Sequence, residues 1–173
     1  MTRDQRIVAT GAASGIVIMV GLVWLLSSLL PAPTVADTAA DRIAFALPWG
    51  VLAAVPLFAM VIVVGNGRFA SEAIDPTLGK ESPEMVVNGR VADNTHQQFT
   101  LFLVGMLALS VMLPIDRLSI IPAVSITFVL MRILFWVGYR IHPLYRAAGF
   151  AGTAYLNFGL LGAALWFGAE KAF

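Results

Sequence analysis

The sequence predicts an all-α integral membrane protein, and three observations lead to this fold class. Of its 173 residues, 59% are hydrophobic and only 12% are charged, whereas a soluble domain carries about 25% charged residues. Five almost uncharged stretches are long enough to cross about 30 Å of hydrocarbon, which takes about 20 residues. Within lipid, a segment of this length must be helical because its backbone groups need internal hydrogen-bond partners. The chain also lacks cysteine, which excludes disulfides, thiolate metal sites and a cysteine nucleophile.

The first stretch, residues 7–30, follows the short charged segment MTRDQR and could therefore be a signal peptide. The apolar part of a signal peptide has only about 7–15 residues, whereas this stretch has 24 uncharged residues. We therefore expect a retained transmembrane helix, which together with an external loop makes up residues 1–42.

The second stretch, residues 43–64, contains Pro48 and Pro56. Membrane helices tolerate such prolines as kinks, so a single span is still expected. It is followed by the longest polar segment of the chain, residues 65–93. Loops of this length inside compact domains are usually functional or disordered, and we expect one or the other here.

The remaining stretches are residues 94–115, 118–137 and 147–169. The LPIDR segment around Pro114 leaves only a short turn between the first two of them, so these helices must be antiparallel neighbours. Residues 43–173 are thus expected to form a four-helix transmembrane domain.

Lysine and arginine are unevenly distributed over the two predicted sides of the membrane. Cytoplasmic loops carry an excess of these residues. With a cytoplasmic N-terminus and an external C-terminus, seven basic residues lie inside and three outside. The inner set is Arg3, Arg6, Arg68, Lys80, Arg90, Arg140 and Arg146, and the outer set is Arg42, Arg117 and Lys171. This orientation brings the start of the third span and the end of the fourth to the same cytoplasmic face.

The segment GRVADNTHQQF places several polar side chains at the start of the third span. Asn94 followed three residues later by Gln97 fits a capping box, in which each side chain bonds an unpaired backbone N–H. Alternatively, a helix that begins before Arg90 would carry Arg90, Asn94 and Gln97 on one face. The sequence leaves both interpretations open, a helix cap and a polar binding site.

The segment RILFWVGYRIHPLYR closes the fourth span on the same side. Arg132 lies about a turn and a half inside the apolar run, where a charge usually faces a bundle interior; the alternative is an extended side chain that reaches the headgroups. Tyr139 shares its helical face, and Arg146 would lie near that face if the helix continued with a kink at Pro143. A lone His142 without a neighbouring carboxylate predicts no metal site.

The motif R-x-x-x-N-x-x-Q in one helix and R-I-L-F-W-V-G-Y-R-I-x-P-L-Y-R-A-x-G-F at the end of the next resemble the MAPEG superfamily. Its members are membrane-associated proteins of eicosanoid and glutathione metabolism. The resemblance covers residues 43–173 and implies a MAPEG-like four-helix bundle, to which residues 1–42 add one N-terminal transmembrane helix. It further implies a homotrimer that binds glutathione, as a co-substrate, between neighbouring protomers near the cytoplasmic face.

The same resemblance implies roles for individual residues. Arg146 would be the catalytic residue that stabilises the glutathione thiolate, because a thiol with a pKa of about 8.5 is mostly protonated at neutral pH and a guanidinium favours its ionised form. The carboxylates of the tripeptide suit bidentate contacts with arginine. The residues implied in binding glutathione are Arg90, Asn94, Gln97, Arg132 and Tyr139.

Two positions depart from the pattern of active family members. Gln97 stands where many of them carry Glu, and a neutral amide cannot form an ion pair with an α-ammonium group. Phe135 stands where Tyr or His is frequent, and a phenyl ring offers no hydrogen bond. Both departures favour a second interpretation, a non-catalytic MAPEG-like protein that binds lipid or scaffolds partners. A small transporter fits less well, because the charges gather at one face rather than along a path through the midplane.

The expected function is that of a glutathione-dependent transferase or peroxidase acting on a lipophilic substrate that arrives from the bilayer. Membrane lipids are the expected surroundings, and the absence of a basic run gives no indication of a nucleic-acid partner. We expect a multi-pass protein of a bacterial inner membrane, rather than of an organelle membrane.

Overall fold

The computed structural model describes the backbone of residues 1–172 and the side chains of residues 1–170, so the outer-face assignment of Lys171 lies outside the described side chains. The described residues contain no strand, and five long helices make up most of the chain. Each is long and apolar enough to cross a membrane, which confirms the all-α membrane fold. The helices are α1 (Arg3–Leu29), α2 (Ala39–Phe69), α3 (Pro83–Met112), α4 (Ile120–Ile141) and α5 (Ala147–Ala172).

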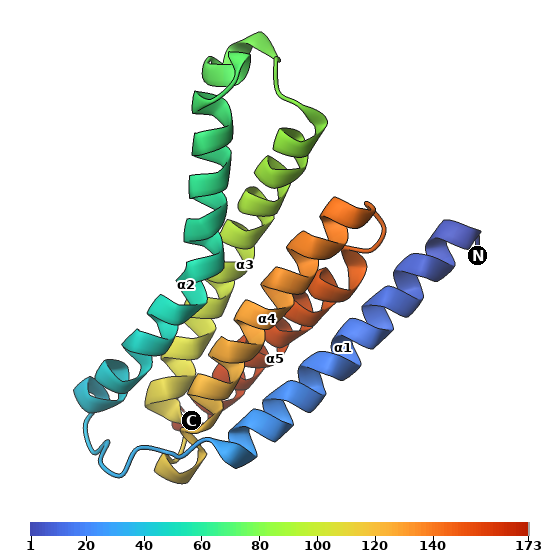
Figure 1. The fold of residues 1–173 in the computed structure, drawn as a ribbon. Helices are drawn as coiled ribbons and strands as arrows, with labels where there is room; N and C mark the ends of the chain where they lie inside the picture. Colours follow the sequence, from blue (N-terminus) through green and yellow to red (C-terminus); the bar gives the residue numbers. More distant parts are fainter. Residues whose placement is uncertain (173) are drawn as a thin grey trace.

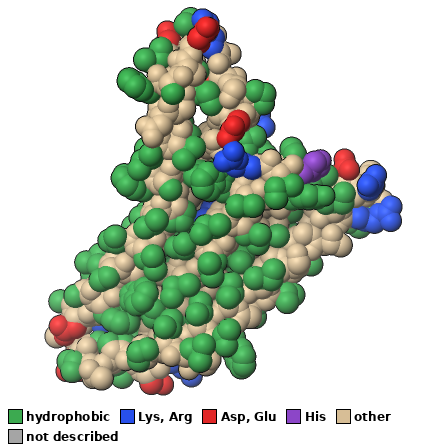
Figure 2. Space-filling model, in the orientation of Figure 1, with side chains coloured by type: hydrophobic (Ala, Val, Ile, Leu, Met, Phe, Trp, Pro, Cys, Tyr) green, Lys and Arg blue, Asp and Glu red, His purple; other side chains and the backbone are tan. Residues whose placement is uncertain are grey.

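Figure 1 shows how the helices are arranged. α2 packs against α3, α4 packs against α5, and α1 lies on the outside along α4 and α5. Hydrophobic side chains cover the middle of the face shown in Figure 2, whereas charged side chains gather at its ends. This distribution matches a bundle whose middle lies in hydrocarbon.

α1 begins after Thr2, whose side chain takes part in a reciprocal capping box at the helix start. The helix crosses the start of α5 at very short range. A Cβ atom at Gly15 would lie 2.0 Å from the carbonyl oxygen of Ala148, so this crossing requires glycine. The N-terminal helix is therefore a packed part of the bundle.

α2 contains Pro48 and Pro56 within one continuous helix, as predicted. It continues to Phe69, past the predicted end at residue 64. The extra turn is held by the next segment, because Arg68 forms an ion pair of 2.6 Å with Glu81.

The polar segment 65–93 differs from the long loop that the sequence predicted. Its first part completes α2 and its last part begins α3, so the connection itself is only residues 70–82. Two 3₁₀ helices, Glu72–Ile74 and Pro76–Leu78, occupy much of this connection. The many charged residues of this segment favoured the prediction of a loop over residues that are helical.

α3 begins well before the predicted start of the third span. Ser82 caps it by accepting a hydrogen bond from the N–H of Met85, and Pro83 occupies the first helical turn, where its missing N–H leaves no bond unmade. Asn94 therefore lies inside the helix, and its interpretation as a helix cap is wrong. The structure shows the alternative, a helix that begins before Arg90 and includes Asn94 and Gln97.

α4 ends at Ile141, directly before the extended residue His142 (φ −159°, ψ 138°). A residue that precedes proline disfavours the helical conformation, so Pro143 ends the helix instead of kinking it. α5 then returns tightly against α4. A Cβ atom at Gly149 would lie 2.2 Å from the backbone nitrogen of Phe135, so this return also requires glycine.

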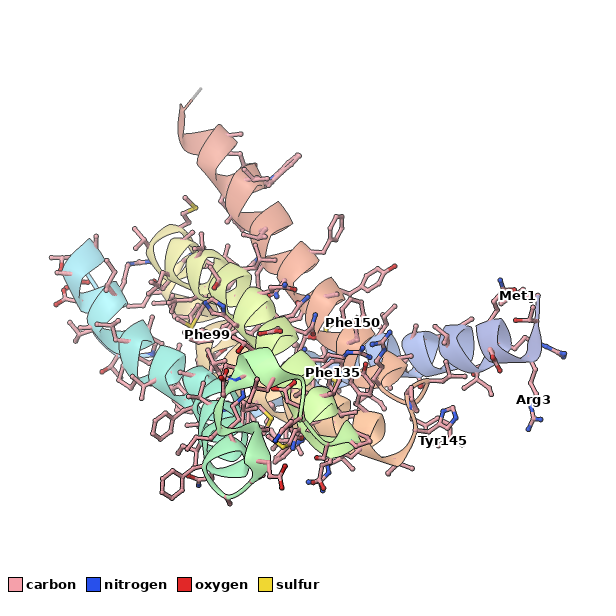
Figure 3. The ribbon with its side chains drawn as sticks, turned by 90° about the horizontal axis from the view of Figure 1, so that it is seen from above. Met1, Arg3, Phe99, Phe135, Tyr145 and Phe150 are labelled. Atoms are coloured by element: carbon pink, nitrogen blue, oxygen red, sulfur yellow. The ribbon has the colours of Figure 1, made fainter. Side chains whose placement is uncertain are left out.

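The interior of the bundle is centred on α3 and α4. Phe102 and Phe128 are fully buried there, with ring centroids 4.5 Å apart. Nearer the α4–α5 turn, Phe135 and Phe150 approach each other with ring centroids at 6.4 Å, and Figure 3 shows them between α4 and α5. The aromatic pairs fix the spacing of the helices that carry the polar residues described next.

Candidate functional site

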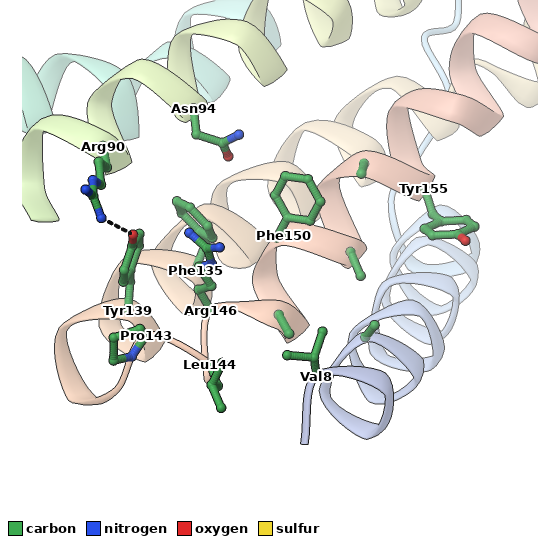
Figure 4. Close-up of a pocket in the computed structure, with 14 residues that line it drawn as sticks. Val8, Arg90, Asn94, Phe135, Tyr139, Pro143, Leu144, Arg146, Phe150 and Tyr155 are labelled. Carbon is green, nitrogen blue, oxygen red and sulfur yellow. Dashed lines mark hydrogen bonds between the residues drawn. The ribbon is translucent and has the colours of Figure 1, made fainter. Parts of the chain in front are cut away.

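A cavity of about 520 Å³ opens at the end of the bundle that carries the α4–α5 turn. Its wall is built by α1, α3, α4, the turn and α5, as Figure 4 shows. Most of the wall is apolar, but it includes two arginines and no carboxylate among its described lining residues. The lining residues used below are Val8, Ala12, Arg90, Asn94, Phe135, Tyr139, Arg146, Phe150 and Tyr155.

Tyr139 lies between the two arginines of the cavity. Nη1 of Arg90 donates to the Tyr139 hydroxyl at 3.5 Å, and this bond is the dashed line in Figure 4. The guanidinium carbon of Arg146 lies 4.8 Å from the centre of the Tyr139 ring, within the range of a cation–π contact. The predicted grouping of Arg90, Tyr139 and Arg146 is thus present in space, although the turn, and not a continuous helix, brings Arg146 there.

Arg146 directly precedes the first residue of α5. Its carbonyl oxygen accepts a hydrogen bond from the N–H of Phe150 at 3.0 Å, as in the first turn of a helix. The N–H groups of that turn and the helix dipole both favour a nearby negative charge. The exposed guanidinium of Arg146 adds a full positive charge at the same place.

Arg132 lies in the interior and does not line this cavity. Its side chain is 1% exposed. Nη2 donates to the side-chain oxygens of Asn94 (3.1 Å) and Thr95 (2.9 Å), and Nη1 donates to Thr153 Oγ1 (3.1 Å). Its guanidinium also covers the ring of Phe135 at 4.1 Å. The burial confirms the prediction that this charge faces the bundle interior. Arg132 contacts two residues of the cavity wall, Asn94 and Phe135.

No carboxylate forms an ion pair with Arg132 among the side chains of residues 1–170. Three neutral oxygens and an aromatic face surround the guanidinium instead. Since these groups come from α3, α4 and α5, the buried arginine joins all three helices.

Gln97 is exposed and is absent from the cavity wall. The adjacent Gln98 is buried, and both its backbone oxygen (2.9 Å) and its side-chain oxygen (2.8 Å) accept hydrogen bonds from Asn157 Nδ2. One residue rotates a helix by about 100°, so the two glutamines face different surroundings. Gln98 therefore joins α3 to α5.

Several residues of this region were not found from the sequence. Thr153 and Asn157 lie four residues apart in an apolar span, and this spacing could have indicated one polar helix face. No comparable signal marks Val8 and Ala12, because the docking of α1 on α5 decides that they line the cavity. The N-terminal helix thus contributes to a site that the motifs alone had placed in the other four helices.

Comparison with known proteins agrees with this architecture. The model of the MAPEG family matches residues 46–166, which leaves α1 outside the matched range. Transmembrane protein 79 of Bos taurus is 26% identical over 129 residues, which are 75% of this chain and 32% of that protein. Transmembrane protein 79 of Mus musculus is 26% identical over 116 residues, 67% of this chain and 29% of that protein.

The chain therefore spans about a third of the length of the curated relatives it matches. Their name states no activity, and both are mammalian, so they lend no support to the expected bacterial inner membrane. No solved structure matches the chain. The family match covers most of the chain and all of the residues grouped around Tyr139, and on this ground the chain belongs to the MAPEG family.

Proposed function

We propose that this protein binds glutathione in the cavity and uses it to conjugate or reduce a lipophilic substrate. The observation that carries the proposal is the convergence of Arg90 and Arg146 on Tyr139, at the start of α5, in a cavity whose described lining includes no carboxylate. Glutathione is an anion with two carboxylates and an ionisable thiol. A site with two guanidinium groups and a helix N-terminus suits both features.

In this proposal the polar residues divide the work. Arg90 and Asn94 bind the peptide, and the Tyr139 hydroxyl fixes its orientation. Arg146 stabilises the thiolate. Its sulfur then forms a bond to an electrophilic carbon with loss of the leaving group, or to a peroxide oxygen with cleavage of the O–O bond. In the second case the alkoxide takes a proton from water to leave as the alcohol, and a second glutathione reduces the resulting sulfenic acid to the disulfide and water. Arg132 acts indirectly, because its bond to Asn94 Oδ1 holds that amide in the cavity wall.

The apolar part of the wall supports a lipophilic second substrate. Val8 of α1 and Tyr155 of α5 line the side of the cavity away from Arg90, as Figure 4 shows, and Ala12 of α1 is also part of the wall. α1 and α5 are membrane-spanning by length and composition. The apolar lining that these two helices contribute suits a substrate that is dissolved in the bilayer.

A homotrimer with a cytoplasmic N-terminus completes the proposal. Gln97 and Leu101 are exposed on the same stripe of α3, and a polar side chain within a membrane span is more stable against protein than against lipid. A second protomer on this stripe would cover Gln97. Native mass measurement should give three copies, and reporter fusions should place Lys80 inside.

A non-catalytic role is the second candidate, and two observations favour it. Gln97 is absent from the cavity wall, and Phe135 presents a ring without a hydrogen-bonding group. Either feature could reflect a family member that has kept the fold and lost turnover. Such a protein would bind lipid or a partner without using a thiol.

A glutathione titration of the detergent-purified protein, followed by turnover of a generic electrophile, tests the proposal. Saturable binding with turnover is expected. Arg140→Ala is the control for Arg146→Ala, because Arg140 is also an arginine near the α4–α5 turn. It lies at the end of α4, pairs with Glu84 and does not line the cavity. Binding without turnover would favour the non-catalytic role, and a lack of binding would exclude both glutathione-dependent activities.

A further inference from the structure

A second cavity, of about 600 Å³, lies between α1 and α5 towards the end of the bundle that carries the α3–α4 turn. Its wall is almost entirely apolar. The exception at its end is Arg117, and Tyr155 borders both this cavity and the one described above. The lining residues are Met19, Val20, Val23, Trp24, Leu109, Leu113, Arg117, Ile120, Val124, Tyr155, Leu156, Gly159, Leu160, Ala163 and Phe167. We call it the α1–α5 groove.

The groove results from the way α1 is attached to the bundle. α1 touches α5 closely at Gly15, and near its other end Ser119 donates a hydrogen bond to the carbonyl oxygen of Ser27 at 3.0 Å. Between these two points α5 presents Gly159 and Ala163, which are too small to fill the space beside α1. Two fixed contacts with small residues between them leave an elongated gap.

The dimensions of the groove fit one acyl chain. From Tyr155 to Phe167 the helix rises about 18 Å at about 1.5 Å per residue. A single leaflet accounts for half of a hydrocarbon core of about 30 Å. The groove thus extends over about the depth of one leaflet, and its apolar wall offers nothing to water or to a polar ligand.

Arg117 supplies a charge at the end of the groove where a headgroup would lie. It belongs to the 3₁₀ helix Ile115–Arg117 between α3 and α4, and it is exposed. None of the ion pairs formed by the side chains of residues 1–170 includes it. Its guanidinium can therefore donate paired hydrogen bonds to a phosphate or carboxylate group.

We propose that the α1–α5 groove is a binding site for an anionic membrane lipid, whose acyl chain fills the groove and whose headgroup pairs with Arg117. This site is separate from the glutathione site and does not depend on it. Lipid tails are as apolar as the groove itself, so packing of the tail gives little selectivity. The charge at Arg117 decides which lipid is retained.

Native mass spectrometry of the delipidated protein, titrated with phosphatidylglycerol or phosphatidylcholine of identical acyl chains, tests this site. The wild type should retain one phosphatidylglycerol per chain in preference to phosphatidylcholine. Arg117→Gln should reduce that preference by about fivefold, the effect of one basic residue near a membrane surface. Since Arg117 lies in an exposed turn, this variant is expected to fold whatever the fate of the variants below.

Two glycine variants test the groove itself. A Cβ atom at Gly159 would meet nothing within 4 Å, so Gly159→Leu should place its side chain in the groove, narrow it and weaken retention of both lipids. Gly162 is equally open but lies outside the groove, so Gly162→Leu should retain lipid like the wild type.

Three results would overturn the proposal. They are equal lipid retention by Gly159→Leu and Gly162→Leu, an unchanged headgroup preference in Arg117→Gln, and a change of oligomeric state in Gly159→Leu without loss of lipid. The last result would show that another copy of the chain covers the groove.

Discussion

Arg132 and Arg146 occupy two regions with opposite properties, although both lie on the path from α4 into α5. Arg132 is buried, and its two Nη groups donate to Asn94, Thr95 and Thr153, three neutral side chains of the neighbouring helices. Arg146 is exposed at the cavity wall, where its guanidinium stacks on Tyr139. One arginine has both Nη groups bonded to protein oxygens, and the other presents its donors to a cavity.

The difference indicates that similar residues in one motif do different work. A buried charge is tolerated only where hydrogen bonds replace its lost hydration, so the interior arginine fixes the packing of three helices. An exposed guanidinium beside a helix N-terminus is available for an incoming anion. We therefore expect Arg132 to stabilise the fold and position Asn94, and Arg146 to take part in the reaction.

The largest expected effect comes from removing the buried arginine. Arg132→Ala should lower the free energy of unfolding by about 3 kcal/mol, because it leaves a large cavity and deprives three side chains of a partner. Arg132→Met preserves the volume without the charge and should cost much less stability, while it still weakens glutathione binding through Asn94. Denaturant titration in mixed micelles measures the first effect. Equal stability of Arg132→Ala and the wild type would contradict the structural role.

Removing the cavity arginine should leave stability unchanged and reduce turnover. Arg146→Ala is expected to lower kcat by about 10²-fold, as does loss of one charge-stabilising donor. The affinity for glutathione should fall much less, because charge on sulfur is greater in the activated thiolate than in the bound thiol. Steady-state kinetics beside equilibrium binding separates the two quantities. An Arg146→Ala enzyme with normal kcat would contradict the catalytic role of Arg146.

Arg90 should show a third pattern, intermediate in size. It contacts the Tyr139 hydroxyl and would bind the peptide away from sulfur. Arg90→Ala should raise the Kd for glutathione by about tenfold, the value of one hydrogen bond to a charged group. kcat at saturating glutathione should change by no more than about twofold. A loss confined to kcat would move Arg90 from binding to catalysis.

The smallest effect is expected at Gln97, which is exposed outside the cavity wall. Gln97→Glu introduces the carboxylate that many active family members carry. An exposed ion pair contributes at most about 1 kcal/mol, so glutathione affinity should change by no more than about fivefold in isothermal titration. A much larger gain would show that position 97 contacts the bound glutathione directly.

The membrane fold could be predicted from the sequence because long uncharged runs leave few alternatives in lipid. The true starts and ends of helices outside hydrocarbon were harder to find. Residues 83–93 are polar and were assigned to a loop, although the Ser82–Pro83 pair that starts α3 was visible. A helix start marked by one or two residues is easily missed when the polar composition of the whole segment indicates a loop.

The candidate site could be predicted where its residues lie in one helix, because helical periodicity places Arg90 and Asn94 on the same face. It was not predictable where tertiary packing decides. The exposure of Gln97 depends on which neighbours cover α3, and the approach of Arg146 to Tyr139 depends on the turn after Pro143. The contribution of α1 to the cavity wall depends on the close crossing of α1 and α5 at Gly15, and no sequence motif predicted this crossing.

Ultraviolet difference absorbance of bound glutathione near neutral pH tests whether Arg146 stabilises a thiolate. The wild type should show a thiolate signal, because Arg146 and the start of α5 lower the pKa of the bound thiol below its free value of about 8.5. Arg146→Ala should bind glutathione without that signal, and Arg140→Ala should retain it. Saturated wild-type protein that shows no thiolate signal, or an Arg146→Ala protein with an undiminished one, would contradict the claim.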